Sequence, residues 1–95
     1  MLKYLEKNKD TVDILRMVNK IAECIFKEKI TISLLKGDYA HSYSLHKHNT
    51  EIADVIKYYD SLYVLIPEFK DNTEFIKAVT LALPDVEIQG VPWTP

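Results

Sequence analysis

The sequence predicts one small domain of the α/β class, with α+β as the related alternative. Three features support this prediction: an amphipathic helical pattern near the N-terminus, two alternating β-type stretches in the middle, and a strand–helix–strand pattern towards the end. The 95 residues fit one domain, and 47% apolar with 27% charged residues is an ordinary globular composition. We therefore expect residues 1–95 to form a single unit.

The first predicted element is a helix over residues 10–28. Asp10 is a suitable N-cap, and apolar residues recur at helical spacing from Val12 to Ile25. Lys27 lies near its end, where a cation is favourable. The pattern of residues 1–9 leaves open whether they form an arm or a further helical segment.

Residues 30–35 and 39–47 alternate between apolar and polar side chains on either side of Lys36-Gly37-Asp38. Two alternating runs around a Gly-containing turn are typical of a β-hairpin. Residues 49–59 then predict a second helix, because Asn49 or Thr50 can cap it and Ile52, Val55 and Ile56 follow helical spacing. A continuous helix over residues 52–66 is the alternative.

The apolar run of residues 62–66 predicts a strand that is covered on both faces. Asp71 and Glu74 resemble a capping box for a third helix, which Pro84 ends. Residues 86–89 predict the last strand, and residues 91–95 a tail. The expected order is α-β-β-α-β-α-β, with a mixed four-stranded sheet, helices packed on its faces and a right-handed crossover within residues 62–88.

The charge balance argues against nucleic-acid binding. Lys and Arg number 12 against 14 Asp and Glu, and Arg16 is the single arginine, whereas nucleic-acid binders carry a basic excess. A basic strip remains conceivable, because six lysines fall in the first third of the chain, at positions 3, 7, 9, 20, 27 and 29. Nucleic acid is therefore not the favoured partner.

The chain shows no feature of a secreted or membrane protein. Cys24 is the single cysteine, so no intramolecular disulfide can form. The first residues lack an apolar signal segment, and the run 62–66 is too short to cross a bilayer. We expect a cytoplasmic protein, of the producing or host cell, that does not bind membranes.

Histidines are the first candidates for chemistry. His46 and His48 stand two apart on a predicted strand, so they would share one face and are weak candidates for zinc binding. His41 would lie on the opposite face, where it is a weak candidate for a general acid or base. We expect solvated histidines, no cofactor and no catalytic set, and an inert Cys24 in the middle of its helix.

Two other regions are candidates for binding. Glu68, Lys70 and Asp71 follow the apolar strand, where α/β proteins collect ligands, but no glycine-rich phosphate motif accompanies them. Tyr58 and Trp93 are candidates for partner binding, because Tyr and Trp are enriched at interface hot spots. The alternative for Trp93, which the pattern favours slightly, is a lid on the core.

The function that these features favour is a small intracellular interaction protein, which binds and inhibits or regulates another macromolecule in the manner of phage inhibitors or of immunity and antitoxin proteins. Extra apolar residues on helix 10–28, such as Met17 and Cys24, also favour a homodimer through that helix. The alternatives are a nucleic-acid or nucleotide binder and a small metal- or histidine-dependent enzyme. An enzyme is the less favoured class.

Overall fold

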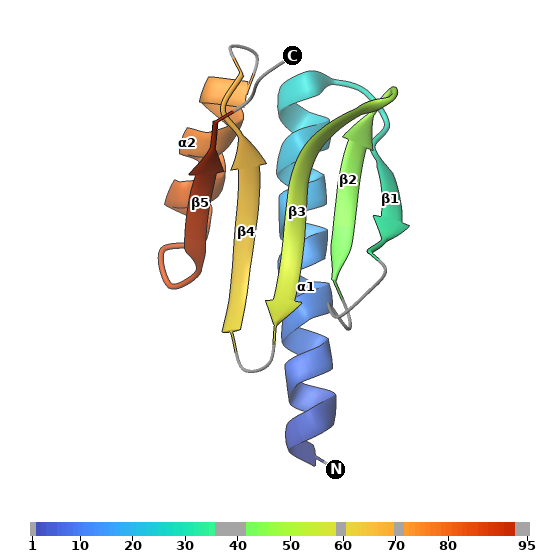
Figure 1. Cartoon of the computed structure of the whole chain (residues 1–95), viewed down its shortest axis with the longest axis vertical. Helices are drawn as coiled ribbons and strands as arrows, with labels where there is room; N and C mark the ends of the chain where they lie inside the picture. The colour runs from blue at the N-terminus through green and yellow to red at the C-terminus, as the bar shows by residue number, and fades with distance from the viewer. Residues whose placement is uncertain (1, 36–41, 59–60, 70–71, 93–95) are drawn as a thin grey trace.

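The computed structural model describes residues 2–35, 42–58, 61–69 and 72–92, with side chains described from residue 11 onward except that of Tyr58. In this part of the chain, two helices pack on a five-stranded mixed sheet (Figure 1). The elements in chain order are α1 (Leu2–Phe26), β1 (Thr31–Leu34), β2 (Tyr43–Lys47), β3 (Thr50–Tyr58), β4 (Ser61–Pro67), α2 (Thr73–Ala82) and β5 (Glu87–Val91).

The strands lie in the sheet in their chain order, β1-β2-β3-β4-β5. Neighbours from β1 to β4 are antiparallel, and β5 is parallel to β4, so α2 is the crossover between these two strands. The predicted small domain of helices on a mixed sheet is confirmed in its α+β form, because four of the five strands form an antiparallel run, and the β1–β2 hairpin and the strand–helix–strand unit are confirmed as well. The turn Lys36-Gly37-Asp38 lies outside the described residues.

The helix predicted over residues 49–59 is wrong, because this segment is β3. The described sheet therefore has five strands instead of four, and the continuous helix over 52–66 is also excluded. A β-bulge explains the misleading pattern: Leu45 pairs with Ala53 but His46 pairs with Glu51, so Ile52 is the extra residue. Because of this extra residue, Ile52 lies in the core together with Ala53 and Val55. Ile52 and Val55 are three residues apart, a spacing that a regular strand would place on opposite faces and that is typical of a helix.

Helix α1 begins at Leu2 rather than after Asp10, so the predicted N-cap is wrong and residues 2–9 belong to the helix. No glycine or proline interrupts Leu2–Phe26, and Leu, Lys and Glu favour helix. The N-terminal part of α1 extends past the end of the sheet (Figure 1).

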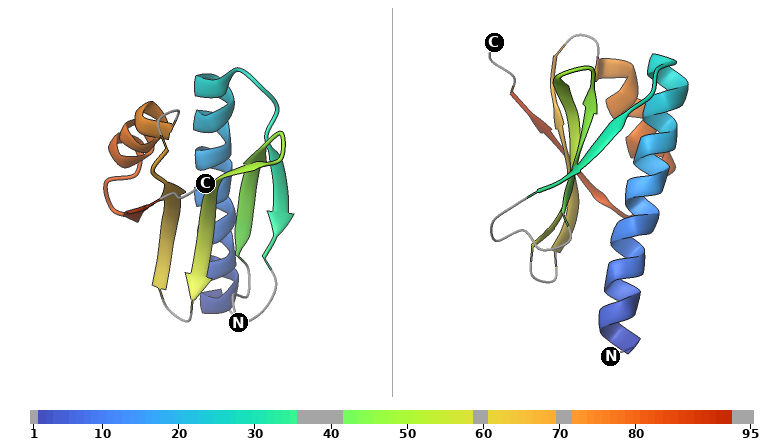
Figure 2. Two further views of the ribbon diagram at one scale, coloured as in Figure 1. Left: turned by 45° about the horizontal axis from the view of Figure 1, so that its top comes forward. Right: turned by 90° about the vertical axis from the view of Figure 1, so that its right-hand side faces the viewer.

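Both helices cover the same face of the sheet, as the edge-on view in Figure 2 shows. The core lies between these helices and the sheet. Its fully buried residues include Val18 and Ala22 of α1, Phe75 and Val79 of α2, and Val64 of β4. The expectation that β4 is covered by helices on both sides is wrong, because its second face has no helix over it in the described structure.

Helix α2 starts one residue later than a cap at Asp71 would require, with Asn72 at the N-cap position. The Asn72 side chain makes no capping bond. Its amide instead donates to the backbone oxygens of Ile52 at 3.3 Å and Pro67 at 3.0 Å. Asn72 is fully buried and thereby ties the start of α2 to the bulge in β3 and to the end of β4.

Among the described helices, none is both long enough and apolar enough to cross a membrane.

Candidate functional site

An apolar hollow lies between the two helices. It has a volume of about 410 Å³, and its accessible surface is entirely apolar. Its lining consists of Met17, Lys20, Ile21, Cys24 and Ile25 from α1 and of Ala78 and Ala82 from α2. We call this the interhelical groove.

Small side chains create the groove. Ala78 and Ala82 stand four residues apart, so both lie on the side of α2 that meets α1. Met17 and Ile21 have the same spacing on α1. Because alanine fills little space, a hollow remains between the two helices although they are in contact. Lys20 lines the groove without adding polar surface, as expected when a lysine stem lies along apolar surface and its ammonium group reaches solvent.

The groove is open to a partner because its apolar side chains are accessible. Met17 is 42% exposed, and Cys24 is exposed as well. The expected inert thiol is thus not a buried one. Methionine adapts its shape to different contacts, which suits a binding surface.

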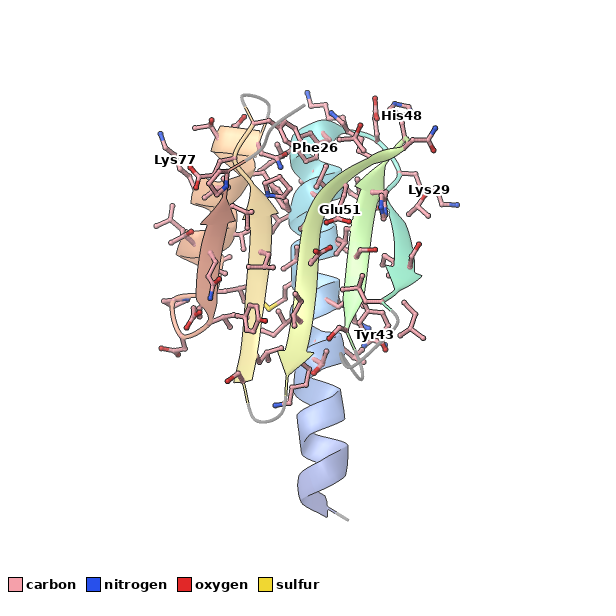
Figure 3. All side chains as sticks on the ribbon, in the orientation of Figure 1. Phe26, Lys29, Tyr43, His48, Glu51 and Lys77 are labelled. Carbon is pink, nitrogen blue, oxygen red and sulfur yellow. The ribbon has the colours of Figure 1, made fainter. Side chains whose placement is uncertain are left out.

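The second candidate is a polar cluster on the uncovered face of the sheet. His46 of β2 faces Glu51 of β3, with Nε2 and Oε1 3.9 Å apart. Glu51 also interacts with Asp54 on the same strand. Figure 3 shows Glu51 on the side of β3 that points away from α1. The cluster therefore brings an imidazole and two carboxyl groups together across two strands.

Asp54 is the unusual member of this cluster. Burial, together with a hydrogen bond to the neighbouring Glu51 carboxyl and charge repulsion from it, raises the pKa of Asp54 to about 7. One of its oxygens is buried with no hydrogen-bond partner among the described residues. Asp54 is thus partly protonated near neutral pH, which reduces the cost of holding a partly buried negative charge beside the exposed Glu51 carboxylate.

The two predicted zinc-binding histidines do not share a face. His46 belongs to β2, but His48 lies in the β2–β3 turn with a positive φ of 58°. Its Nε2 lies 2.9 Å from a carboxylate oxygen of Glu28, and Figure 3 shows His48 away from Glu51. In the described part of the chain, no three His, Cys, Asp or Glu side chains are placed to hold a metal ion. His41 lies outside the described residues.

The predicted ligand loop is only partly described. The Glu68 backbone N–H donates to the Val91 oxygen at 2.8 Å, and the Glu68 side chain lies over Gly90, where a Cβ would collide with it. Glu68 also lines a hollow of about 290 Å³ beside α2, together with Phe69 and Lys77. Lys70 and Asp71 lie outside the described residues.

The two aromatic candidates for partner binding remain predictions. Tyr58 is the last residue of β3, but its side chain is not described, and Trp93 lies outside the described residues. Of the basic residues, Arg16, Lys20 and Lys27 are exposed along α1 and directly after it. Lys3, Lys7 and Lys9 belong to α1 by their backbone alone, so the basic strip also remains a prediction.

Comparisons of the chain with protein-family models, with curated proteins and with solved structures give no match.

Sequence reasoning missed the groove and the Asp54 cluster for different reasons. The apolar excess on α1 was visible at Met17 and Cys24, but nothing in the sequence showed that Ala78 and Ala82 would lie opposite them. The sequence pattern placed Glu51 and Asp54 on a helix. A helix has no neighbouring strand, so this prediction gave no reason to pair either residue with His46. The available signal was that Ser44 and His46, two residues apart on a predicted strand, lie on the same polar face of the sheet.

Proposed function

We propose that this protein is a binding module whose interhelical groove receives the apolar face of an amphipathic helix of another protein. The observation that carries the proposal is a hollow with an entirely apolar accessible surface, with accessible Met17 beside it. A polar surface would be the norm for a helix pair facing solvent, and an accessible apolar groove is the usual receptor for an amphipathic helix.

The chemistry of the groove describes the partner. The lining residues Met17, Ile21 and Cys24 follow one flank of α1, so a partner helix lying along it needs apolar side chains at positions such as i, i+3, i+4 and i+7. Lys20 at the groove and exposed Arg16 one turn before it favour acidic residues along the edge of that helix. Inhibition or regulation of the partner would follow from covering this helix.

The single cysteine provides a direct test, because Cys24 is exposed and lines the groove. A photoreactive maleimide attached to Cys24, followed by irradiation in an extract of the cells that produce the protein, should crosslink one partner, and the crosslinked residue should lie on an amphipathic helix. Met17→Glu should reduce this crosslink at least tenfold, since a carboxylate in the groove opposes both apolar contact and acidic flanks.

Leu81→Glu is the matched control. Leu81 is 83% exposed on α2 but does not line the groove, so this variant should crosslink like the wild type. Equal crosslinking in the Met17→Glu variant, or attachment to nucleic acid, would contradict the proposal. Attachment to a second copy of the chain would favour instead the homodimer through residues 10–28 that the sequence predicts.

A further inference from the structure

Strand β1 forms one edge of the sheet, and its outward hydrogen-bonding groups can be identified. The Leu35 N–H donates to the Ser42 oxygen at 2.9 Å, which makes Leu35–Ser42 a hydrogen-bonded pair. Since such pairs alternate along an antiparallel ladder, Thr31 and Ser33 also direct their backbone groups towards β2. The backbone N–H and C=O groups of Ile32 and Leu34 therefore point to the free edge.

The same two residues carry exposed apolar side chains. Ile32 is 41% and Leu34 is 62% exposed. They lie opposite Leu45 and Tyr43 of β2, which pack in or against the core, so they project from the face that α1 covers. Figure 1 shows β1 at the side of the sheet that is farthest from α2.

The β1 edge lacks most of the features that usually prevent strand pairing. The Thr31–Leu34 segment has no proline and no charged side chain, and the bulge of the sheet lies between β2 and β3. Its shortness, at four residues, is the remaining protection. An edge of this kind pairs with another strand whenever register and side chains match.

We propose that β1 pairs with β1 of a second copy in antiparallel orientation, about a two-fold axis at Ser33. This register places Ile32 opposite the partner's Leu34 and Leu34 opposite the partner's Ile32. All four are residues with outward backbone groups, so each pair exchanges two N–H···O=C bonds. The exposed apolar side chains meet each other on the helix-covered face, and Ser33 faces its own copy on the other.

The symmetry explains why a second copy fits better than an arbitrary strand. The axis is perpendicular to the sheet, so both helix layers stay on one side and the two sheets become continuous. A four-residue pairing buries less than the roughly 1,000 Å² in total that a specific, stable interface needs. The dimer should therefore be weak and dependent on concentration.

This dimer is independent of the proposed function. Groove and edge use different residues, and α2, which forms one wall of the groove, packs beside β4 and β5 at the opposite side of the sheet (Figure 1). A dimer formed through β1 would leave the groove open on each copy.

Analytical ultracentrifugation over a range of concentrations tests the proposal with two variants of Leu34. Leu34→Pro removes only an outward N–H, so it leaves the bonds to β2 in place while blocking the new pairing. Leu34→Lys keeps the N–H but adds like charges to the interface. The wild type should associate to twice the mass of one chain, and both variants should shift the dissociation constant at least tenfold. Circular dichroism should show that both remain folded.

Two control variants make the result specific. Leu81→Lys introduces the same charge at an exposed leucine of α2 and should dimerise like the wild type. Met17→Glu, which removes groove binding, should also dimerise normally. A wild type that stays monomeric at the highest concentration overturns the proposal. A dimer that survives both Leu34 variants but is lost in Met17→Glu overturns it as well and assigns association to α1.

Discussion

The Asp54 carboxyl shows how a single residue is defined by its neighbours. It lies on the central strand, between Ser44 of β2 and Leu65 of β4, with Glu51 on its own strand. Ser44 is buried and Leu65 is apolar, so little water surrounds the Asp54 carboxyl. Neither residue is a lysine or arginine, so the strand partners of Asp54 supply no positive charge. This environment disfavours the charged carboxylate and therefore favours the protonated form of Asp54.

Stability should consequently decrease as the pH rises through the window from about 4 to about 7. The folded protein holds the Asp54 proton up to about pH 7, whereas the unfolded chain releases it near pH 4. The folded state thus binds more protons in this window, and the free energy of unfolding falls with rising pH. Asp54→Asn should flatten the dependence and gain about 1 kcal/mol at pH 8, since partial exposure screens the effect.

Urea unfolding at pH 5 and pH 8 measures this difference. Asp85→Asn, at an exposed position after α2, removes one negative charge without touching the cluster and should leave the pH dependence unchanged. A wild type that is more stable at pH 8 than at pH 5 would contradict the assignment.

At the scale of elements, Asn72 is the residue that sets where α2 begins. Its amide hydrogens reach the backbone of β3 and β4 from a fully buried position, so it joins three elements that are far apart in the chain. The capping pattern Asp71–Glu74 predicted the correct helix with the wrong anchor. Nothing in the sequence marks Asn72 as a buried link rather than a loop residue.

Replacing Asn72 should therefore affect stability more than a surface cap would. Asn72→Ala removes the donor to one buried and one partly buried carbonyl and should cost about 2–3 kcal/mol. Asn72→Asp should cost more at pH 7, because a carboxylate would face these carbonyls, and should recover partly at pH 4, where a protonated carboxyl can donate one bond. Thermal unfolding at both pH values measures this; equal losses at the two pH values would contradict the donor role.

At the scale of the whole molecule, the described structure is two layers, with helices on one face of the sheet only. The arrangement separates three surfaces: the groove between the helices, the β1 edge, and the sheet face opposite the helices with His46, Glu51 and Asp54. The groove and the edge bind by different modes, since one receives a helix and the other adds a strand.

Association through β1 predicts that thermal stability depends on protein concentration. The dimer is a state of the folded chain that the unfolded chain lacks, so the melting temperature should rise with concentration. Leu34→Pro should remove this dependence while Leu81→Lys retains it. Differential scanning calorimetry at two well-separated concentrations provides the measurement, and a wild-type melting temperature that does not change would contradict it.

The sequence by itself determined a small domain of the α/β or α+β class, the helix that follows Asp10, the hairpin and the strand–helix–strand unit. These depend on local periodicity, on turn residues and on breakers such as Pro84, which act within a few residues of the chain. The sequence also showed apolar residues at Met17 and Cys24 outside the main stripe of the helix, but it did not show that they line a groove against α2.

Only the tertiary structure decided that residues 50–58 form a strand and that Asp54 is buried beside Glu51. It also decided that Ala78 and Ala82 leave a groove against α1, and that Ile32 and Leu34 stand at an open edge. The physical reason is the same in each case. A bulge, a cross-strand neighbour and a helix–helix contact arise between segments distant in sequence, so packing overrides or completes a local pattern that is compatible with more than one structure.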